Sequence, residues 1–191
     1  MLPNDLISQE VIKEFTITSQ AKIPKHNKID IKDFKIGYIV GSSGSGKSIM
    51  LKEYNTETHH KWTNAVCSNF KDYHQAKTRL LGAGLSSIPA WLKDYNVLST
   101  GQKYRADLAI GIKDNAVFDE FTSVLDRDTA KGLACSISNY INQENITGIV
   151  FAGPHRDIIQ YLKPDWVYDT DTRCLYTDKE PQQMIPFMEI T

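Results

Sequence analysis

The chain has 191 residues, of which 41% are hydrophobic and 24% charged, and its formal net charge is −1. This is ordinary globular composition, and the near-zero charge supplies no overall field that would attract nucleic acid or an anionic membrane. No apolar run approaches the about 20 residues that span a bilayer, and the N-terminus lacks the basic and apolar stretches of a secretory signal. The three cysteines are widely spaced, as in a reducing compartment, so we expect a cytoplasmic protein.

The N-terminal region, residues 1–35, is predicted to form a small β cap. Val11 to Thr18 is rich in β-branched residues and indicates a strand, and Lys28 to Ile31 indicates a weaker partner strand. Basic residues outnumber acidic ones here, namely Lys22, Lys25, Lys28, Lys32 and Lys35. A solvated face is the simpler interpretation of these lysines, and a nucleic-acid patch is the alternative.

The next stretch, Gly41 to Ser48, reads Gly-Ser-Ser-Gly-Ser-Gly-Lys-Ser and matches the pattern G-x-x-x-x-G-K-[ST] at every fixed position. A strand-like run, Ile36 to Val40, precedes it, and a segment of helical composition, Ser48 to Tyr54, follows it. Glycines let the backbone turn its N–H groups inward around phosphate oxygens. The motif therefore predicts a nucleoside-triphosphate site, whereas a flexible Gly/Ser turn is the bland alternative.

Every residue of this motif is a candidate ligand of the triphosphate: Gly41, Ser42, Ser43, Gly44, Ser45, Gly46, Lys47 and Ser48. We expect Lys47 to reach the β- and γ-phosphates and the Ser48 hydroxyl to bind Mg²⁺.

The middle of the chain is predicted to contain a short strand, Asn64 to Phe70, and a helix within Lys71 to Leu85. Three histidines, His59, His60 and His74, lie near Cys67 in the sequence. None of them has the spacing of a zinc site, so we expect no metal there.

A helix is predicted from Gln102 to Ile112, and Leu98-Ser-Thr-Gly-Gln102 opens it. Small polar residues and a glycine at a helix start can present free N–H groups to an anion. The stretch is therefore either a second phosphate-binding helix end or an ordinary N-cap.

Asp119 and Glu120 end another predicted strand, Asn115 to Phe118. Strand alternation points these side chains in opposite directions, so one can hold Mg²⁺ while the other faces a water in line with the γ-phosphate. A helix covering Ala130 to Ile141 and a strand, Gly148 to Ala152, follow.

His155 comes directly after that last strand, where open α/β sheets place their ligand sites, although a surface histidine is the alternative. A closing hairpin is predicted from Trp166 to Asp169 and Cys174 to Thr177, around the turn Thr170 to Arg173. The tail from Lys179, with two prolines, is predicted to be irregular.

In their order and spacing these stretches resemble the ABC-type ATPases over Ile36 to Thr177. The similar stretches are Gly41 to Ser48 (Walker A), Leu98 to Gln102 (the signature, usually Leu-Ser-Gly-Gly-Gln), Ala116 to Glu120 (Walker B), Ser123 to Asp126 (D-loop) and His155 (switch histidine). The resemblance implies an α/β P-loop NTPase with a mixed sheet, flanking helices and Mg²⁺-dependent ATP hydrolysis.

The resemblance also implies roles for single residues. Glu120 would be the general base or the carboxylate that orients the attacking water, Asp119 would hold Mg²⁺ through water, and Lys47 and His155 would complete the catalytic set. The contact with the nucleotide on a partner subunit would come from Ser99, Thr100, Gly101 and Gln102, so a homodimer is expected.

Several residues depart from the family pattern. Thr100 replaces a signature glycine, and Gly153-Pro154 precedes His155 in place of the common Ala-Thr. The family glutamine that contacts the metal is represented by either Asn69 or Gln75, and we take Asn69 as the metal candidate. Phe15 is a candidate to stack on adenine.

Only 49 residues separate Ser48 from Leu98, which implies a shortened helical arm. The whole chain is expected to be one ATPase domain, with a core at residues 36–178 and a tail at 179–191. It looks most like small ABC-type ATPases of phages and mobile elements, which often occur beside acetyltransferase-like domains. This implies an ATP-driven switch acting on a soluble nucleic-acid or protein partner, with an acetyltransferase as one candidate. The alternatives are the ATP-binding subunit of a membrane transporter and, third, a P-loop kinase.

Overall fold

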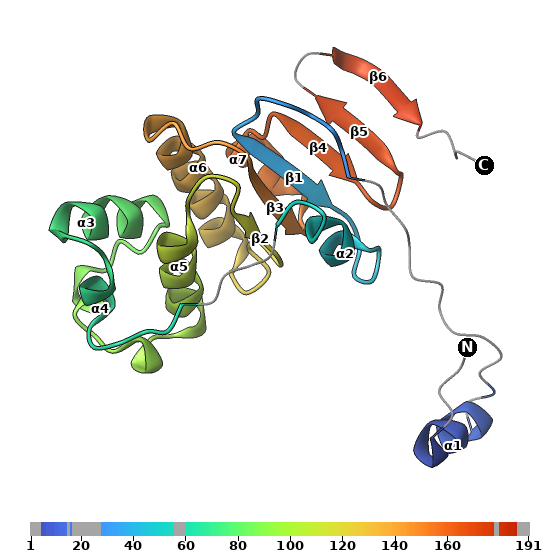
Figure 1. Ribbon diagram of the computed structural model, residues 1–191, viewed down its shortest axis with the longest axis horizontal. Helices are drawn as coiled ribbons and strands as arrows, with labels where there is room; N and C mark the ends of the chain where they lie inside the picture. The colour runs from blue at the N-terminus through green and yellow to red at the C-terminus, as the bar shows by residue number, and fades with distance from the viewer. Residues whose placement is uncertain (1–4, 15, 17–27, 56–59, 178–179, 187–191) are drawn as a thin grey trace.

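The computed structural model describes residues 5–14, 16, 28–55, 60–177 and 180–186, which form a six-stranded sheet with helices on both faces (Figure 1). The strands are β1 (Ile36–Val40), β2 (Val117–Phe118), β3 (Ile149–Gly153), β4 (Trp166–Asp169), β5 (Cys174–Thr177) and β6 (Glu180–Pro186). Their spatial order is β2-β3-β1-β4-β5-β6. β1 pairs in parallel with β3 and β4, β2 pairs in parallel with β3, and the β4–β5 and β5–β6 pairs are antiparallel. The predicted α/β fold with a mixed sheet is confirmed.

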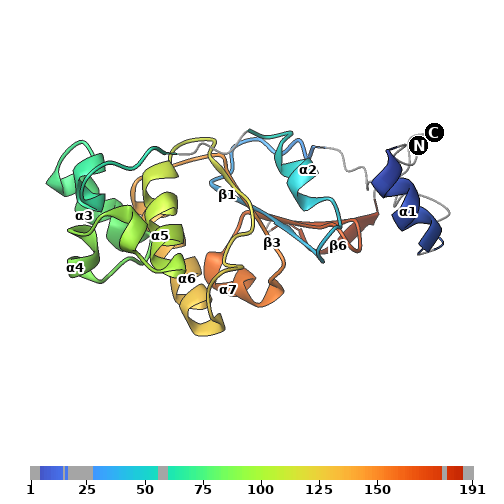
Figure 2. The same ribbon diagram turned by 90° about the horizontal axis from the view of Figure 1, so that it is seen from below.

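Apart from the N-terminal helix α1, the helices lie in three places around this sheet. The described helices are α1 (Leu6–Glu14), α2 (Lys47–Leu51), α3 (Tyr73–Gly82), α4 (Ile88–Trp91), α5 (Thr100–Gly111), α6 (Arg127–Gln143) and α7 (Ile159–Leu162), with short 3₁₀ turns η1 (Val66–Asn69), η2 (Tyr95–Val97) and η3 (Arg156–Ile158). Figure 2 shows α2 on one face of the sheet and α6 and α7 on the other, and Figure 1 shows α3, α4 and α5 as an arm beyond the β2 side. None of the described helices combines the length and apolar character that a bilayer-spanning segment requires.

Two hydrophobic clusters cover the two faces of the sheet. In β1, Tyr38 and Val40 belong to the cluster shared with α3, α5 and α6, whereas Ile39 belongs to the cluster shared with α2. This division follows from strand alternation, and it explains why every residue of β1 and β3 is apolar or glycine and buried. The sheet is therefore held between two helical layers.

The predicted N-terminal strand is wrong, because Val11 to Glu14 belongs to α1. The signal that strand propensity overlooked is an N-cap: the Asp5 carboxylate accepts a hydrogen bond from the Ser8 amide at 3.0 Å. Residues 28–31 are described and form no strand, while Phe15 and residues 17–27 lie outside the described residues. The described part of residues 1–35 therefore contains a helix and no β cap.

The predicted strand from Asn64 to Phe70 is also wrong, because Val66–Asn69 forms the 3₁₀ turn η1. The Asn69 amide donates to the carbonyl oxygens of Thr63, Ala65 and Val66 at 2.8, 3.0 and 3.3 Å. These side-chain bonds occupy backbone acceptors that a strand would need for its ladder.

The tail prediction is wrong for residues 180–186, which form β6. Proline argued against a strand there, but β6 lies at the edge of the sheet, where a missing N–H donor is tolerated. The β4–β5 hairpin and the helices α3, α5 and α6 agree with the predictions from sequence.

Two glycine substitutions test the packing of this fold. Gly37 in β1 lies against Trp166, and a Cβ at residue 37 would come within 2.1 Å of that indole, whereas a Cβ at Gly132 in α6 would meet open space. We expect Gly37→Ala to lower the free energy of unfolding by about 1–3 kcal/mol through overpacking. Gly132→Ala, the control, should raise it by about 0.5–1 kcal/mol because alanine favours a helix.

The measurement is equilibrium unfolding in urea. The free energies of unfolding are compared between variants whose dependence on urea concentration has the same slope. A Gly37→Ala protein as stable as the wild type would contradict the packing of Trp166 across β1.

Candidate functional site

Four parallel strands end at the same edge of the sheet, and each is followed by residues of the candidate site. β1 leads into Gly41–Ser48, β2 into Asp119–Glu120, β3 into Pro154 and His155, and β4 into Thr170–Asp171. The carboxyl edge of an open parallel sheet is where such folds bind ligands. The structure thus brings the predicted loop, carboxylate pair and histidine to one edge.

The loop between β1 and α2 has a backbone that only glycine adopts easily. Gly44 and Gly46 have φ values of 77° and 95°, in the left-handed region. Ser43 and Gly44 are exposed at the crest of the loop, and a Cβ at Gly44 would meet nothing within 4 Å. The crest is therefore open to a ligand.

Lys47 lies beneath this loop with only 5% of its surface exposed. Its ammonium group donates to the carbonyl oxygens of Gly41 and Ser42, at 3.0 and 2.7 Å. An ammonium group has three donors, so these two bonds leave one for a phosphate oxygen. Lysine is rarely buried without such partners, and here the two carbonyl oxygens hold its ammonium group at the start of the loop.

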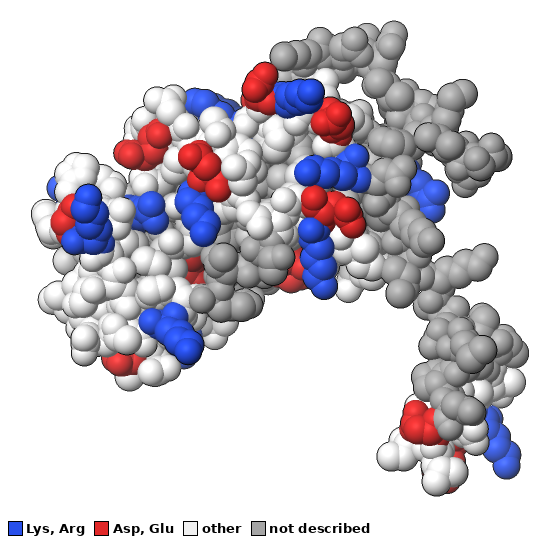
Figure 3. Space-filling model, in the orientation of Figure 1, with Lys and Arg blue, Asp and Glu red and all other residues white. Residues whose placement is uncertain are grey.

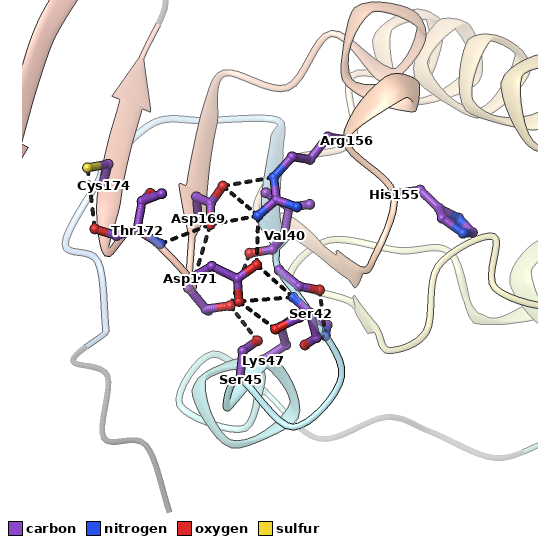
Figure 4. Close-up of polar contacts among 12 residues, drawn as sticks. Val40, Ser42, Ser45, Lys47, His155, Arg156, Asp169, Asp171, Thr172 and Cys174 are labelled. Carbon is purple, nitrogen blue, oxygen red and sulfur yellow. Dashed lines mark hydrogen bonds and ion pairs between the residues drawn. The ribbon is translucent and has the colours of Figure 1, made fainter.

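The turn after β4 holds the first half of the loop, as Figure 4 shows. The Thr170 amide donates to the Val40 carbonyl oxygen at 2.8 Å, and the Thr170 and Ser45 hydroxyls lie 2.6 Å apart. The Ser42 amide and hydroxyl both donate to the Asp171 carboxylate. The sequence predicts only a turn from Thr170 to Arg173, because no motif marks these contacts.

Glu120 stands at a strained corner directly after β2. Its φ is 51° and that of Thr122 is 68°, values that cost non-glycine residues about 1–3 kcal/mol each. The Glu120 carboxylate accepts a hydrogen bond from the Ser123 hydroxyl at 2.5 Å, and its amide donates to Asp119 at 2.9 Å. The exposed Glu120 carboxylate is thus oriented by the residue three positions later.

His155 is held at two points. Its carbonyl oxygen accepts from the Tyr38 hydroxyl at 2.9 Å, and its Nδ1 lies 3.2 Å from the Thr122 hydroxyl oxygen. If that hydroxyl donates, Nε2 carries the imidazole proton and can donate to a ligand. Burial, followed by the nearby charge of Arg127, lowers the pKa of His155 from its ordinary value, although Glu120 opposes the shift. The neutral form of His155 is therefore favoured at pH 7.

The stretch that opens α5 forms a capping box. The Ser99 hydroxyl accepts from the Gln102 amide at 3.3 Å, and the Gln102 side chain accepts from the Ser99 amide at 3.1 Å. Ser99 and Thr100 are exposed, and a Cβ at Gly101 would lie 3.1 Å from the Leu125 side chain. The structure therefore brings the signature-like and D-loop-like stretches together.

Asn69 is not presented as a metal ligand, because its amide closes the loop around η1 and its oxygen accepts from the Thr63 amide at 3.0 Å. Gln75, the other candidate, accepts from the Lys71 amide at 3.0 Å. Among the described residues, no group of three or more His, Cys, Asp or Glu side chains could hold a metal. The oxygen donors of Ser48 and Asp119 suit Mg²⁺, which commonly combines one or two protein ligands with phosphate oxygens.

A cavity of about 380 Å³ lies beside β2 and α5. Ala116, Val117 and Phe118 all line it, and because consecutive strand residues face opposite ways, it must lie at the edge of the sheet. It borders Asp119 and Glu120, but its described lining includes no residue of Gly41–Ser48. It is therefore separate from the phosphate loop.

Asp107 on α5 holds the aromatic wall of this cavity. It accepts from the Trp62 indole at 2.8 Å and from the Tyr95 hydroxyl at 2.5 Å, and the two rings stack with centroids 4.9 Å apart.

On the face shown in Figure 3, the Lys and Arg side chains are mixed with Asp and Glu side chains.

No protein-family model and no curated protein matches the chain, but solved structures do. One is the dimeric structure of MJ0796, a bacterial ABC transporter cassette, with 17% identity over 77% of this chain and 85% of that chain and a TM-score of 0.56. MJ0796 in a dimeric post-hydrolysis state bound to ADP and Pi gives 16% identity over 81% and 86%, with a TM-score of 0.54. cbiO1 from Clostridium perfringens, part of the ABC transporter complex cbiONQ, gives 19% identity over 77% of each chain and a TM-score of 0.54. The chain thus has the fold of ABC ATP-binding cassettes.

The electrostatics of His155 can be tested by NMR titration of its imidazole protons. We expect its midpoint below the ordinary value of about 6.5. Because the folded-state pKa is lowered, the unfolded chain binds the proton more readily than the folded chain does. The contribution of His155 to the free energy of unfolding is therefore complete above the unfolded-state pKa of about 6.5, and it is lost as the pH falls through the folded-state pKa.

Arg127→Ala should raise the midpoint because it removes a neighbouring positive charge. Lys131→Ala, which removes an α6 charge paired with Asp128, is the matched control and should leave the midpoint unchanged. Equal midpoints in wild type and Arg127→Ala would contradict the assigned cause.

Proposed function

We propose that the chain binds ATP with Mg²⁺ in the Gly41–Ser48 loop, hydrolyses it, and uses ATP-driven homodimerisation to switch a soluble partner in the cytoplasm. The observation that carries this proposal is the buried Lys47 ammonium, held across a glycine loop whose crest is open. A buried cation within a glycine-rich loop of this kind suits the β- and γ-phosphates of a nucleotide.

Ser48 and Asp119 are the residues that would hold Mg²⁺. Their oxygen atoms are the ligands this ion prefers, and their side chains follow β1 and β2 at the same sheet edge. When bound, the ion would neutralise charge that develops on the phosphate oxygens.

Glu120 would act as the general base. Its carboxylate is exposed and oriented by Ser123, so it can accept a proton from the water that attacks the γ-phosphate. Neutral His155 would donate a hydrogen bond from Nε2 to a γ-phosphate oxygen, with Thr122 fixing its tautomer. Lys47 would stabilise the charge on the β- and γ-phosphates.

The homodimer would place Ser99–Gln102 of one subunit against the γ-phosphate bound to the other. Four charge-assisted hydrogen bonds from two symmetric sites would contribute roughly 6–12 kcal/mol. Association itself costs about 4–15 kcal/mol, so the dimer should be marginal and should depend on ATP. The similarity to a dimeric cassette, MJ0796, supports this arrangement.

The partner is proposed to be a nucleic acid or a protein such as an acetyltransferase. The second candidate function, the ATP-binding subunit of a membrane transporter, is favoured by the transporter cassettes among the similar structures. A permease gene beside this one would support the transporter function, and an acetyltransferase-like gene would support the soluble switch.

The Glu120→Gln variant tests the function by two measurements, the rate of ATP hydrolysis and light scattering, which reports the dimer. We expect hydrolysis to slow by roughly 10²–10⁴-fold while ATP binding remains, so the dimer should accumulate with Mg-ATP and be absent without it. Adding Ser99→Arg should prevent the dimer by placing a bulky side chain at the shared site, without loss of ATP binding.

Lys47→Ala is the negative control, since it should neither bind ATP nor dimerise. A Glu120→Gln protein that stays monomeric with Mg-ATP at tens of micromolar would refute the dimer, and unchanged hydrolysis would refute the role of Glu120.

A further inference from the structure

An ionic link joins the segment that carries His155 to the start of the phosphate loop (Figure 4). Arg156, the next residue after His155, donates to both oxygens of Asp169 at 2.9 and 3.1 Å and to Asp171 at 2.7 Å. Asp171 in turn accepts three hydrogen bonds from Ser42. Side chains that follow β3 and β4 are thus connected to the loop that follows β1.

Both oxygens of the Asp171 carboxylate are used on Ser42. The Ser42 amide lies 3.1 and 2.9 Å from them, and the Ser42 hydroxyl donates to one at 2.7 Å. An asparagine at this position would offer one acceptor oxygen and would turn an NH₂ group toward either Ser42 or Arg156, both of which donate. A carboxylate is therefore the group that fits.

Asp169 keeps the link rigid on the other side. It is only 7% exposed, and one of its oxygens also accepts from the Asp171 amide at 2.9 Å. The hydrogen bonds from Ser42 and then those from Arg156 lower the pKa of Asp171 below its ordinary value, so it remains charged at neutral pH.

The carboxylates of Asp169 and Asp171 lie where their charge is unfavourable for the binding of an anion. Two carboxylates beside a loop that binds phosphate repel the ligand, and Arg156 balances only one of them. A negative charge that weakens anion binding needs a compensating role, and its contacts with Ser42 provide one: they fix the loop before the ligand arrives.

We propose that Asp171 and Arg156 are positioning residues, which hold the start of the phosphate loop in its binding conformation and tie it to the segment of His155. The inference rests on the proposed function for its effect on ATP, but the anchoring of the loop is independent of ATP.

The experiment compares Asp171→Asn with the wild type by two measurements. Hydrogen exchange of the peptide covering residues 41–46, followed by mass spectrometry without nucleotide, should become at least tenfold faster because the Ser42 amide loses its anchor. The Kd for Mg-ATP should rise at least tenfold, while kcat at saturating ATP changes less than threefold because Glu120 and His155 are intact.

The sign of the ATP effect separates positioning from charge. Removing a negative charge by itself should tighten ATP binding, so weaker binding identifies the lost geometry. Asp128→Asn is the matched control, because its carboxylate is 98% exposed on α6 in an ion pair with Lys131, and it should change neither measurement.

Arg156→Ala completes the test. It should raise the Kd for Mg-ATP as Asp171→Asn does. The Kd of the double variant should not exceed that of the single variant with the higher Kd, because both residues act through one link. Ser42→Ala keeps the amide and loses only the hydroxyl bond, so it provides a milder variant, with a three- to tenfold rise in Kd, should Asp171→Asn fail to fold.

ATP binding by Asp171→Asn as tight as in the wild type, or unchanged exchange of residues 41–46, would overturn the proposal; if Asp171→Asn does not fold, an unchanged Kd in Ser42→Ala would do so. Failure of the proposed function has a different signature, in which the wild type itself does not bind ATP. The exchange measurement then still decides whether the link anchors the loop.

Discussion

The site depends on one constraint: a loop can bind a polyanion tightly only if its amides are turned inward before the ligand arrives. Left-handed Gly44 and Gly46 provide the turn, and the buried Lys47 ammonium holds the carbonyl oxygens of Gly41 and Ser42 from within. The same ammonium group is the cation that a phosphate would meet. In the proposed function, anchoring the loop and binding the ligand would therefore share one side chain.

The sheet decides what surrounds this loop. Because β2, β3, β1 and β4 run in parallel, everything that follows them meets at one edge. Glu120 and His155 are each fixed there by a neighbouring hydroxyl, from Ser123 and Thr122, and the positive φ values of Glu120 and Thr122 store strain at that corner. Strain of this kind persists where surrounding packing over-determines the backbone, and the core on both faces of the sheet supplies that packing.

The sequence predicted the parts of this architecture that local pattern controls. Apolar runs located β1 and β3, helical spacing located α3 and α6, the small polar stretch Leu98 to Gln102 located the start of α5, and the glycine motif located the loop. The errors came where side chains form hydrogen bonds with the backbone. Asp5 caps a helix where β-branched residues suggested a strand, and the Asn69 amide donates to backbone carbonyl oxygens that a strand would use. Asp171 and Arg156 were missed because their partners lie 129 and 13 residues away, in Ser42 and Asp169, and no local pattern encodes such contacts.

The most direct test of the account is calorimetric titration of the wild-type protein with ATP, ADP and AMP in the presence of Mg²⁺. If the loop and Lys47 grip the β- and γ-phosphates, ATP and ADP should bind, and AMP should bind about 10²-fold more weakly or worse, since each lost charge-assisted hydrogen bond costs about 1.5–3 kcal/mol. Equal affinity for AMP and ATP, or no binding of any of the three, would contradict the assignment of Gly41–Ser48 as a triphosphate-binding loop.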